Sequence, residues 1–142
     1  MPVQLGTSIH ASDRVSTAHA AAGSTSTPAT PLDLGPQGGR NQPFLKLQIT
    51  APAVPSLVDA KTIIFSVTDC ATSGGSYTAV AGMTAVITQL GAGGAGAAAA
   101  SLIVPVPDHM RRYVKVTAAV LAAGGDNTAV SHIMEVVRDF QG

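Results

Sequence analysis

The stretch Phe44-Leu45-Lys46-Leu47-Gln48-Ile49-Thr50 decides the fold class of this chain. Its apolar and polar residues alternate, so that Leu45, Leu47 and Ile49 share one face of an extended segment. A period of two is typical of a β-strand with one buried and one exposed face. Pro52 and Pro55 follow closely and end the strand, because proline cannot donate a ladder hydrogen bond.

Further segments with the character of short strands follow along the chain. Residues 62–68 are rich in β-branched side chains, and residues 113–121 place valine or alanine at every second position. Pro105 removes a ladder donor from the segment 101–106, so we expect that strand at a sheet edge or bent there. The alanine-rich residues 91–100 are interrupted by glycines, which disfavour a helix and predict a loop.

A strong turn signal, Gly-Gly-Asp-Asn at residues 124–127, lies between the last two expected strands. Glycine and asparagine tolerate the positive φ of tight hairpin turns. We therefore expect residues 128–138 to return as the antiparallel partner of residues 113–121. Weaker strand patterns occupy residues 77–80 and 83–90.

Short strands without a convincing amphipathic helix indicate an all-β fold. We predict an antiparallel jelly-roll or β-sandwich body over residues 44–142, with a closed barrel as the alternative. Residues 1–43 are expected to form an extended N-terminal arm. Their Ser, Thr, Ala, Gly and Pro content offers too few large apolar side chains to offset the entropy of ordering the chain. We expect the arm to be flexible alone and to become ordered against a partner.

The chain carries unusually little charge. Eight Lys and Arg balance eight Asp and Glu, and charged residues make up 11% of the sequence, against a usual share of about 25%. Proteins with so little charge tend to associate, which suggests that partners cover much of the surface. Neutrality argues against nucleic acid as a partner, because phosphate binding depends on clustered Lys and Arg.

The sequence predicts neither a membrane span nor a secretory signal. There is no run of about 18 or more apolar residues, and the N-terminus lacks a basic start followed by an apolar stretch. We therefore expect no membrane partner. The protein should be made in the cytoplasm and should act there or in a particle assembled there.

No catalytic or cofactor motif is recognisable. The histidines, His10, His19, His109 and His132, lack the close spacing of zinc ligands, and we expect them to be solvated or hydrogen-bonded. Cys70 is alone, so we expect no internal disulfide and a buried small residue beside a turn. The chain lacks both a Gly-x-Ser-x-Gly elbow and a P-loop ending. We predict that it is not an enzyme and binds no cofactor.

Two places favour specific contacts with a partner protein. Leu32 and Leu34 would lie on one side of a short strand and dock the arm. Arg111 and Arg112 suit bidentate bonds to carboxylates, so they could pair with a partner's acidic patch; the alternative is a solvated strand entrance. The candidate partner-binding residues are Leu32, Asp33, Leu34, Arg40, Arg111 and Arg112.

The order of several segments resembles a known family. These are the small-residue arm closing in Pro31-Leu32-Asp33-Leu34-Gly35, the strands at residues 101–107 and 111–116, and the last strand at residues 128–139. Together they resemble the cement, or decoration, proteins of tailed-bacteriophage heads, most closely those of Bordetella-type podoviruses. The Ala/Gly-rich residues 91–100 are not part of that pattern.

The resemblance implies a jelly-roll body on the outer surface of the virion capsid, made in the host cytoplasm. It also implies binding across neighbouring subunits of a major capsid protein with the HK97-like fold, as a dimer or trimer, without catalytic residues or cofactors. The alternatives are another virion component, such as a tail, head-completion or fibre protein, and a carbohydrate-binding module. Sugar sites usually present stacking aromatic side chains, and this chain has few: Phe44, Phe65, Tyr77, Tyr113 and Phe140.

Overall fold

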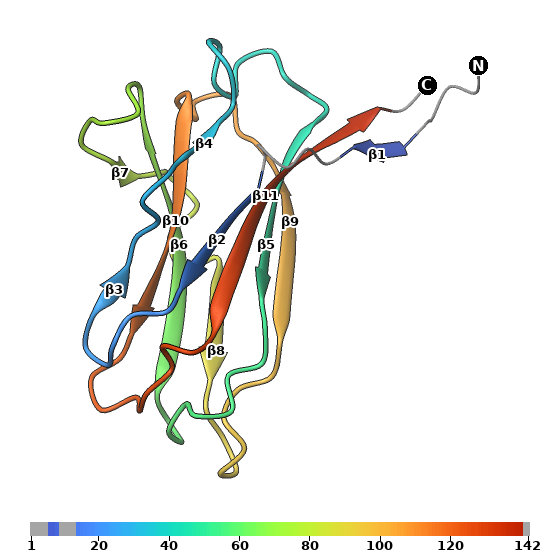
Figure 1. The fold of residues 1–142 in the computed structure, drawn as a ribbon. Coiled ribbons are helices and arrows are strands. Elements are labelled where there is room, and N and C mark those ends of the chain that lie inside the picture. Colours follow the sequence, from blue (N-terminus) through green and yellow to red (C-terminus); the bar gives the residue numbers. More distant parts are fainter. Residues whose placement is uncertain (1–5, 9–13, 141–142) are drawn as a thin grey trace.

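The computed structural model describes residues 6–8 and 14–140, which form a sandwich of two antiparallel β-sheets (Figure 1). One sheet has the order β1-β11-β5-β9, with β2 also paired to β11. The other has the order β3-β10-β6-β7, with β4 paired to β10 and β8 paired to β6. The strands are β1 (Gly6–Ser8), β2 (Arg14–Ala18), β3 (Thr25–Ser26), β4 (Leu32–Asp33), β5 (Leu45–Ala51), β6 (Thr62–Cys70), β7 (Thr78–Ala79), β8 (Ile87–Leu90), β9 (Ala100–Pro105), β10 (Tyr113–Val120) and β11 (Ser131–Phe140).

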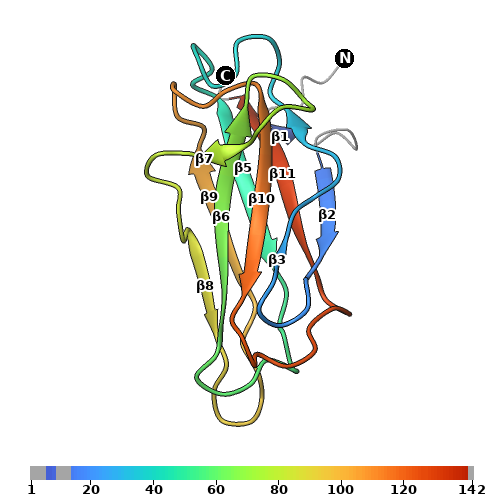
Figure 2. The same cartoon turned by 90° about the vertical axis from the view of Figure 1, so that its left-hand side faces the viewer.

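The expected all-β sandwich is confirmed, and two separate sheets are found in place of a closed barrel. The finer expectation of a jelly roll stays a prediction. Strand β9 is the last strand in the order of its sheet and is paired with β5, so the expected edge position of the segment around Pro105 is correct. Figure 2 looks onto the sheet that contains β3, β10, β6 and β8, with the other sheet behind it.

Along the long strands, the alternation of apolar and polar residues in the sequence corresponds to an alternation of buried and partly exposed side chains. Strand β5 buries every second residue, beginning with Leu45, and β10 buries every second residue, beginning with Val114. Strand β6 contributes Phe65, which is fully buried between the sheets. These faces meet in one continuous apolar core, and burial of such area is the main favourable contribution to folding.

Two expectations about individual strands are wrong. The expected strand over residues 83–90 is a strand only over β8, because Ala85 adopts a positive φ of 54° and interrupts the extended backbone. The expected hairpin between β10 and β11 does not form, since the two strands lie in different sheets. One edge of β10 is occupied by β6 and the other by β3 and β4, so β11 pairs with β5 instead. The glycine-rich segment is therefore a corner between the two sheets.

The expected separation of an N-terminal arm at residue 43 is also wrong for the described residues. Strand β2 pairs with β11 over five residues, and β3 and β4 each pair with β10. Leu32 has 0% exposure and Leu34 is buried beside it, so this segment closes the core of its own chain. Backbone pairing compensates for the scarcity of large side chains. Residues 1–5 and 9–13 of the expected arm, with His10, lie outside the described residues.

The strands place two sets of loops at opposite ends of the sandwich. In Figure 1, the upper end carries the connections from β4 to β5, β6 to β7 and β9 to β10. The lower end carries the connections from β5 to β6, β8 to β9 and β10 to β11. These two ends are called the upper end and the lower end below.

Candidate functional site

The upper end contains an open cleft of about 610 Å³. Its ionisable lining residues are Arg40, Asp108, His109, Arg111 and Arg112, and we call it the arginine cleft. The cleft lies between the β4–β5 loop and the β9–β10 loop. It brings together three of the six residues predicted to bind a partner.

Two adjacent glycines set the walls of this cleft. A Cβ on Gly38 would lie 2.4 Å from the carbonyl oxygen of Met110, and one on Gly39 would lie 2.0 Å from that of Pro107. The backbone N–H of Gly39 also donates to Met110 O at 2.9 Å. The β4–β5 loop can therefore lie directly on the β9–β10 loop only because these side chains are absent. This contact holds Arg40 at the edge of the cleft.

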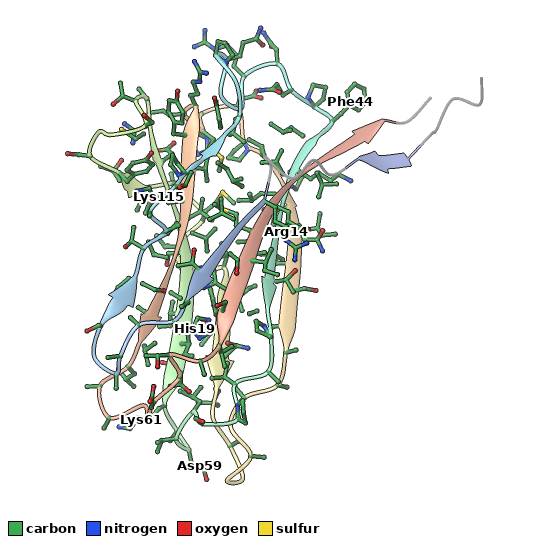
Figure 3. All side chains as sticks on the ribbon, viewed as in Figure 1. Arg14, His19, Phe44, Asp59, Lys61 and Lys115 are labelled. Carbon is green, nitrogen blue, oxygen red and sulfur yellow. The ribbon has the colours of Figure 1, made fainter. Side chains whose placement is uncertain are left out.

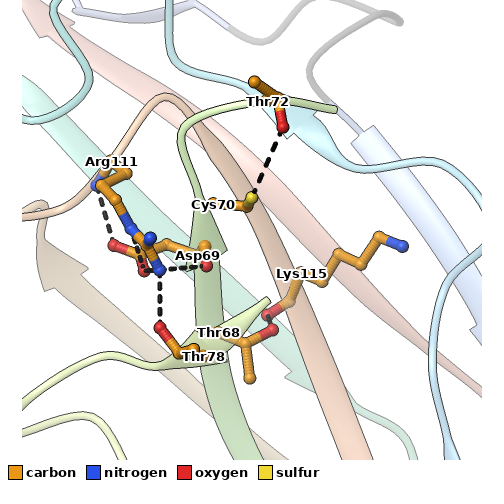
Figure 4. A network of polar contacts seen from close by, with 7 residues as sticks. All are labelled: Thr68, Asp69, Cys70, Thr72, Thr78, Arg111 and Lys115. Carbon is orange, nitrogen blue, oxygen red and sulfur yellow. Dashed lines mark hydrogen bonds and ion pairs between the residues drawn. The ribbon is translucent and has the colours of Figure 1, made fainter. Parts of the chain in front are cut away.

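One wall of the cleft is fixed by an ion pair between Arg111 and Asp69, shown in Figure 4. The guanidinium donates to Asp69 Oδ1 from Nε at 2.9 Å and from Nη2 at 2.6 Å. Nη2 also donates to Thr78 Oγ1 at 2.6 Å. The side chain of Asp69 is only 7% exposed. The bond to this carboxylate raises the pKa of Arg111.

Arg112 forms a second, more exposed pair with Asp33. Nε and Nη2 of Arg112 donate to the two oxygens of Asp33 at 2.8 and 2.9 Å. Asp33 Oδ1 also accepts the backbone N–H of Gly35 at 2.8 Å. The bond to Arg112 lowers the pKa of Asp33. The guanidinium of Arg112 also lies 5.0 Å from the ring centroid of Tyr113.

These contacts correct part of the predicted partner surface. The carboxylates that Arg111 and Arg112 were expected to find on a partner are supplied by Asp69 and Asp33 of the same chain. Leu32 and Leu34 are buried in the sandwich and cannot contact a partner without unfolding. Sequence reasoning could not find these pairs, because 42 residues separate Asp69 from Arg111 and 79 separate Asp33 from Arg112.

Arg40 is the predicted site residue that keeps its charge open to solvent. Its side chain is exposed at the edge of the cleft, and no side-chain acceptor for it is found within the described part of the chain. His109 is exposed nearby, with Nε2 3.3 Å from Ala81 O. Phe44 is also exposed at this end (Figure 3). Arg40 is therefore placed to bind an anionic group on a partner.

The lower end carries a different feature, formed by the exposed side chains of Val58, Leu90 and Leu121. Thr62 is paired with Leu90 in the register of β6 and β8, and its carbonyl accepts the N–H of Leu121 at 3.0 Å. Val58 lies beside them, because its N–H donates to Gly124 O at 3.1 Å. We call these three side chains the apolar end patch. Thr62 lies between Leu90 and Leu121 in this register, and exposed apolar side chains grouped at one end of a sandwich can mark a contact surface.

Sequence reasoning missed the apolar end patch. Leu90 and Leu121 were interpreted as the last residues of strands, and Val58 lies in a loop between two predicted strands. Leu90 and Leu121 closely precede glycine-containing turns, but the sequence gives no sign that these turns meet the loop that contains Val58. A large apolar residue at the solvent end of a strand is a weak signal by itself.

The outer face of the sheet that contains β6 and β10 is nearly uncharged between the two ends. The outward side chains of β6 and β10 are mainly Thr, Ser and Ala, and Lys115 is the charged residue among them. The Lys115 ammonium lies 4.4 Å from the ring centroid of Tyr77. Tyr77 and Tyr113 thus each have a cation near the ring, which leaves less of both rings open for stacking a sugar.

Other candidate chemistry is sparse. Within residues 14–137, no three His, Cys, Asp or Glu side chains converge as metal ligands would. Cys70 is buried beside a turn, as expected, and its Sγ lies 3.8 Å from Thr72 Oγ1 (Figure 4). No helix long and apolar enough to cross a membrane occurs among the residues described.

The expectation that the histidines are solvated or hydrogen-bonded is wrong for His19. Its ring is buried, and neither of its nitrogens has a hydrogen-bond partner within the described structure.

The sequence matches no known family model, and it matches no curated protein at a significant level.

Proposed function

We propose that this protein is a structural protein that decorates the outside of a tailed-phage head. In that role it bridges neighbouring subunits of a major capsid protein with the HK97-like fold and stabilises the shell. The proposal starts from the resemblance of its strand and arm segments to cement proteins. The observation that supports it is that an open cleft with an exposed arginine and a group of exposed aliphatic side chains lie at opposite ends of one sandwich.

A bridging protein needs at least two separate contact surfaces. The arginine cleft offers an open cation at the upper end, and the apolar end patch offers exposed aliphatic side chains at the lower end. Strands of eight or nine residues connect them, a span of about 25–30 Å at about 3.3 Å per residue. The distance between the surfaces is set by paired strands and not by a flexible linker.

The composition supports contact with protein in preference to nucleic acid. The chain has zero formal net charge, and Asp33 and Asp69 neutralise two of the cleft arginines. A nearly uncharged outer face can approach another protein closely at little desolvation cost. Many copies on one shell would gain from multivalency, so each contact need not be strong. We propose that copies also contact one another on the shell as a dimer or trimer, each with a jelly-roll body.

The test is binding to expanded heads that lack the protein, measured by co-sedimentation and by electron microscopy. Purified protein should saturate the shell at hundreds of copies per particle, in proportion to the number of capsomers. Saturation at a handful of copies would instead indicate a connector, tail or head-completion protein. Failure to bind any head or virion part would reject the proposal.

Substitutions at the two surfaces make this test specific. Leu90→Asp and Leu121→Asp, each at the apolar end patch, should weaken binding about tenfold or more, because each buries an unpaired charge in the contact. Ile103→Asp is the matched control: Ile103 is also an exposed aliphatic residue, but it lies on the outer face of edge strand β9. Equal losses for all three variants would contradict a contact at the lower end.

A further inference from the structure

A cluster of three aromatic rings lies between the sheets, and two of the rings are histidines. His19 stacks on His132 with ring centroids 5.4 Å apart and an interplanar angle of 29°. Phe65 meets both rings edge-on, at 5.8 Å from His19 and 5.2 Å from His132. His19 is 3% exposed and His132 is 1% exposed. Figure 3 labels His19 where the chain leaves β2.

The imidazoles in this cluster lack polar partners. Neither nitrogen of His19 has a partner in the described structure, and neither does Nδ1 of His132. Nε2 of His132 lies 3.4 Å from Val116 O, which is a long contact. A neutral imidazole already buries one N–H donor here. A protonated one would bury two donors and a charge, which is far more costly.

Among the residues whose side chains the structure describes, no charged side chain lies near enough to compensate a proton on either ring. The inward side chains of β5 and β10 are apolar, as are those of β6 up to Val67 and of β11 from Met134 to Val136. The other buried ionisable groups among the described residues, Asp69 and Cys70, lie at the upper end of β6. The ionisable group that faces each imidazole is therefore the other imidazole. Burial lowers the pKa of both histidines, to about 4 for His132.

The two histidines belong to different segments of the sandwich. His132 is the second residue of β11 and is paired with Thr17 of β2, while β11 is paired with β5 from the next residue, Ile133, onward. His19 follows directly after β2 and begins a connection that crosses to β3 in the other sheet. We call residues 14–26 the strap. The strap is held by the β2–β11 ladder, by the His19 N–H bond to Val130 O at 2.9 Å, and by a two-residue pairing of β3 with β10.

We propose that His19 and His132 form an acid-sensitive latch that holds the strap closed over the side of the sandwich while both rings are neutral and releases it when they are protonated. Release lets water reach both rings, because the ring of His19 moves out and uncovers that of His132. The strands beyond the strap stay in place, since Leu32 remains buried and Asp33 remains bonded to Arg112. The freed edge of β11 then presents unpaired N–H and C=O groups, which can accept a strand from a neighbouring protein.

Hydrogen–deuterium exchange resolved by peptide tests the latch on the full chain. Protection factors for residues 14–26 are compared with those for β6 and β10, each corrected for the intrinsic exchange rate at that pH. Between about pH 7 and about pH 5, protection of the strap should fall by about tenfold or more, because the open form binds protons more tightly. Protection of β6 and β10 should stay within about threefold over the same range.

The double variant His19→Phe, His132→Phe keeps ring packing and removes both titrating groups. Its strap should stay protected at about pH 5, while His109→Gln, at an exposed histidine, should retain the wild-type loss. Loss of strap protection in the double variant, or simultaneous loss in β6 and β10 of the wild type, would overturn the latch.

If the double variant does not fold, titration of the two histidines in the wild-type protein tests the latch directly. The imidazole resonances of wild-type His19 and His132 are followed by NMR as the pH falls. Both should titrate well below the ordinary range of histidine, and the strap amides should lose protection with the same midpoint. Titration of both rings near pH 6.5 with the strap still protected would also overturn the proposal.

Discussion

The carboxylate of Asp69 accepts hydrogen bonds from three nitrogens of Arg111: the backbone N at 2.8 Å, Nε at 2.9 Å and Nη2 at 2.6 Å. Asp69 lies near the end of β6, and Arg111 lies in the loop that enters β10. Their contact ties the upper ends of two central strands and fixes one wall of the arginine cleft. The next pair along the chain, Arg112 with Asp33, has similar geometry but a much more exposed carboxylate.

This difference in exposure predicts that an Asp→Asn substitution lowers the free energy of unfolding more at Asp69 than at Asp33. Asp69→Asn removes a charged acceptor that is 7% exposed, and we expect the free energy of unfolding to fall by about 2 kcal/mol. Asp33→Asn changes a carboxylate that is 46% exposed, and we expect a loss below about 1 kcal/mol. Urea denaturation of both variants measures the comparison. A larger loss for Asp33→Asn would contradict the assigned burial.

The main strands could be predicted from the sequence because their alternation is a local property. The segments around Leu47 and Val116 each contain a period of two that the burial pattern reproduces, and the segment around Phe65 is rich in β-branched side chains. Pairing between strands is not local. The turn at residues 124–127 has the composition of a hairpin, yet Asn127 is buried and bonds back to Gly124 O and Gly125 O, which shapes a corner between sheets. The choice of neighbour for β10 depends on which strands compete for its edges.

The candidate site was predicted only in part for the same reason. Arg40, Arg111 and Arg112 do line one cleft, but the acids that neutralise the last two are distant in sequence. His19 was assigned to a flexible segment because its neighbours are small and polar. Its burial depends on Phe65 and His132, which no local pattern connects to it.

Leu32 offers a test of whether the N-terminal segment is part of the sandwich in solution. Its side chain is fully buried in the core, whereas that of Leu90 is 56% exposed. Leu32→Ala should lower the free energy of unfolding by about 2–4 kcal/mol, through lost burial and a residual cavity. Leu90→Ala makes the same chemical change and should cost less than about 0.5 kcal/mol. If Leu32→Ala lowered the free energy of unfolding as little as Leu90→Ala, the N-terminal segment would not be packed into the sandwich in solution.

The buried histidines predict that the protein becomes less stable as the pH falls. The pKa of His132 is about 4 in the folded chain, against an ordinary histidine value of 6.5. The unfolded chain therefore binds the proton more tightly. The free energy of unfolding should be constant above about pH 7, fall below about pH 6.5 by up to about 3 kcal/mol, and stop changing from this cause below about pH 4.

Urea titrations at several pH values above about 4.5 avoid most carboxylate protonation and isolate this contribution. The His19→Phe, His132→Phe variant should show a flatter profile over that range, because it retains no buried imidazole. A wild-type stability that rises on acidification would contradict the burial of neutral histidines.

Two glycines of the alanine-rich loop should respond differently to the same substitution. Gly93 and Gly96 have similar positive φ values, 65° and 72°. A Cβ on Gly93 meets nothing within 4 Å, whereas one on Gly96 would lie 2.0 Å from Val54 O and 2.6 Å from Pro55 Cα. Gly93→Ala should therefore cost only the backbone strain, about 1–2 kcal/mol. Gly96→Ala carries the same strain and adds a collision with backbone, for a further loss of about 1–3 kcal/mol.

The reason for the larger cost at Gly96 is a specific pairing that the collision would break. Val54 and Ala97 exchange backbone hydrogen bonds at 2.9 and 3.0 Å, and this bridge fastens the β8–β9 loop to the β5–β6 loop. Thermal unfolding of the two variants gives the difference, and hydrogen exchange at Val54 and Ala97 locates it. Both variants share the strain of a positive φ. An equal loss of stability in the two would therefore show that the loop can move away from Val54 without a free-energy cost. The Val54–Ala97 bridge would then contribute nothing to stability at the lower end.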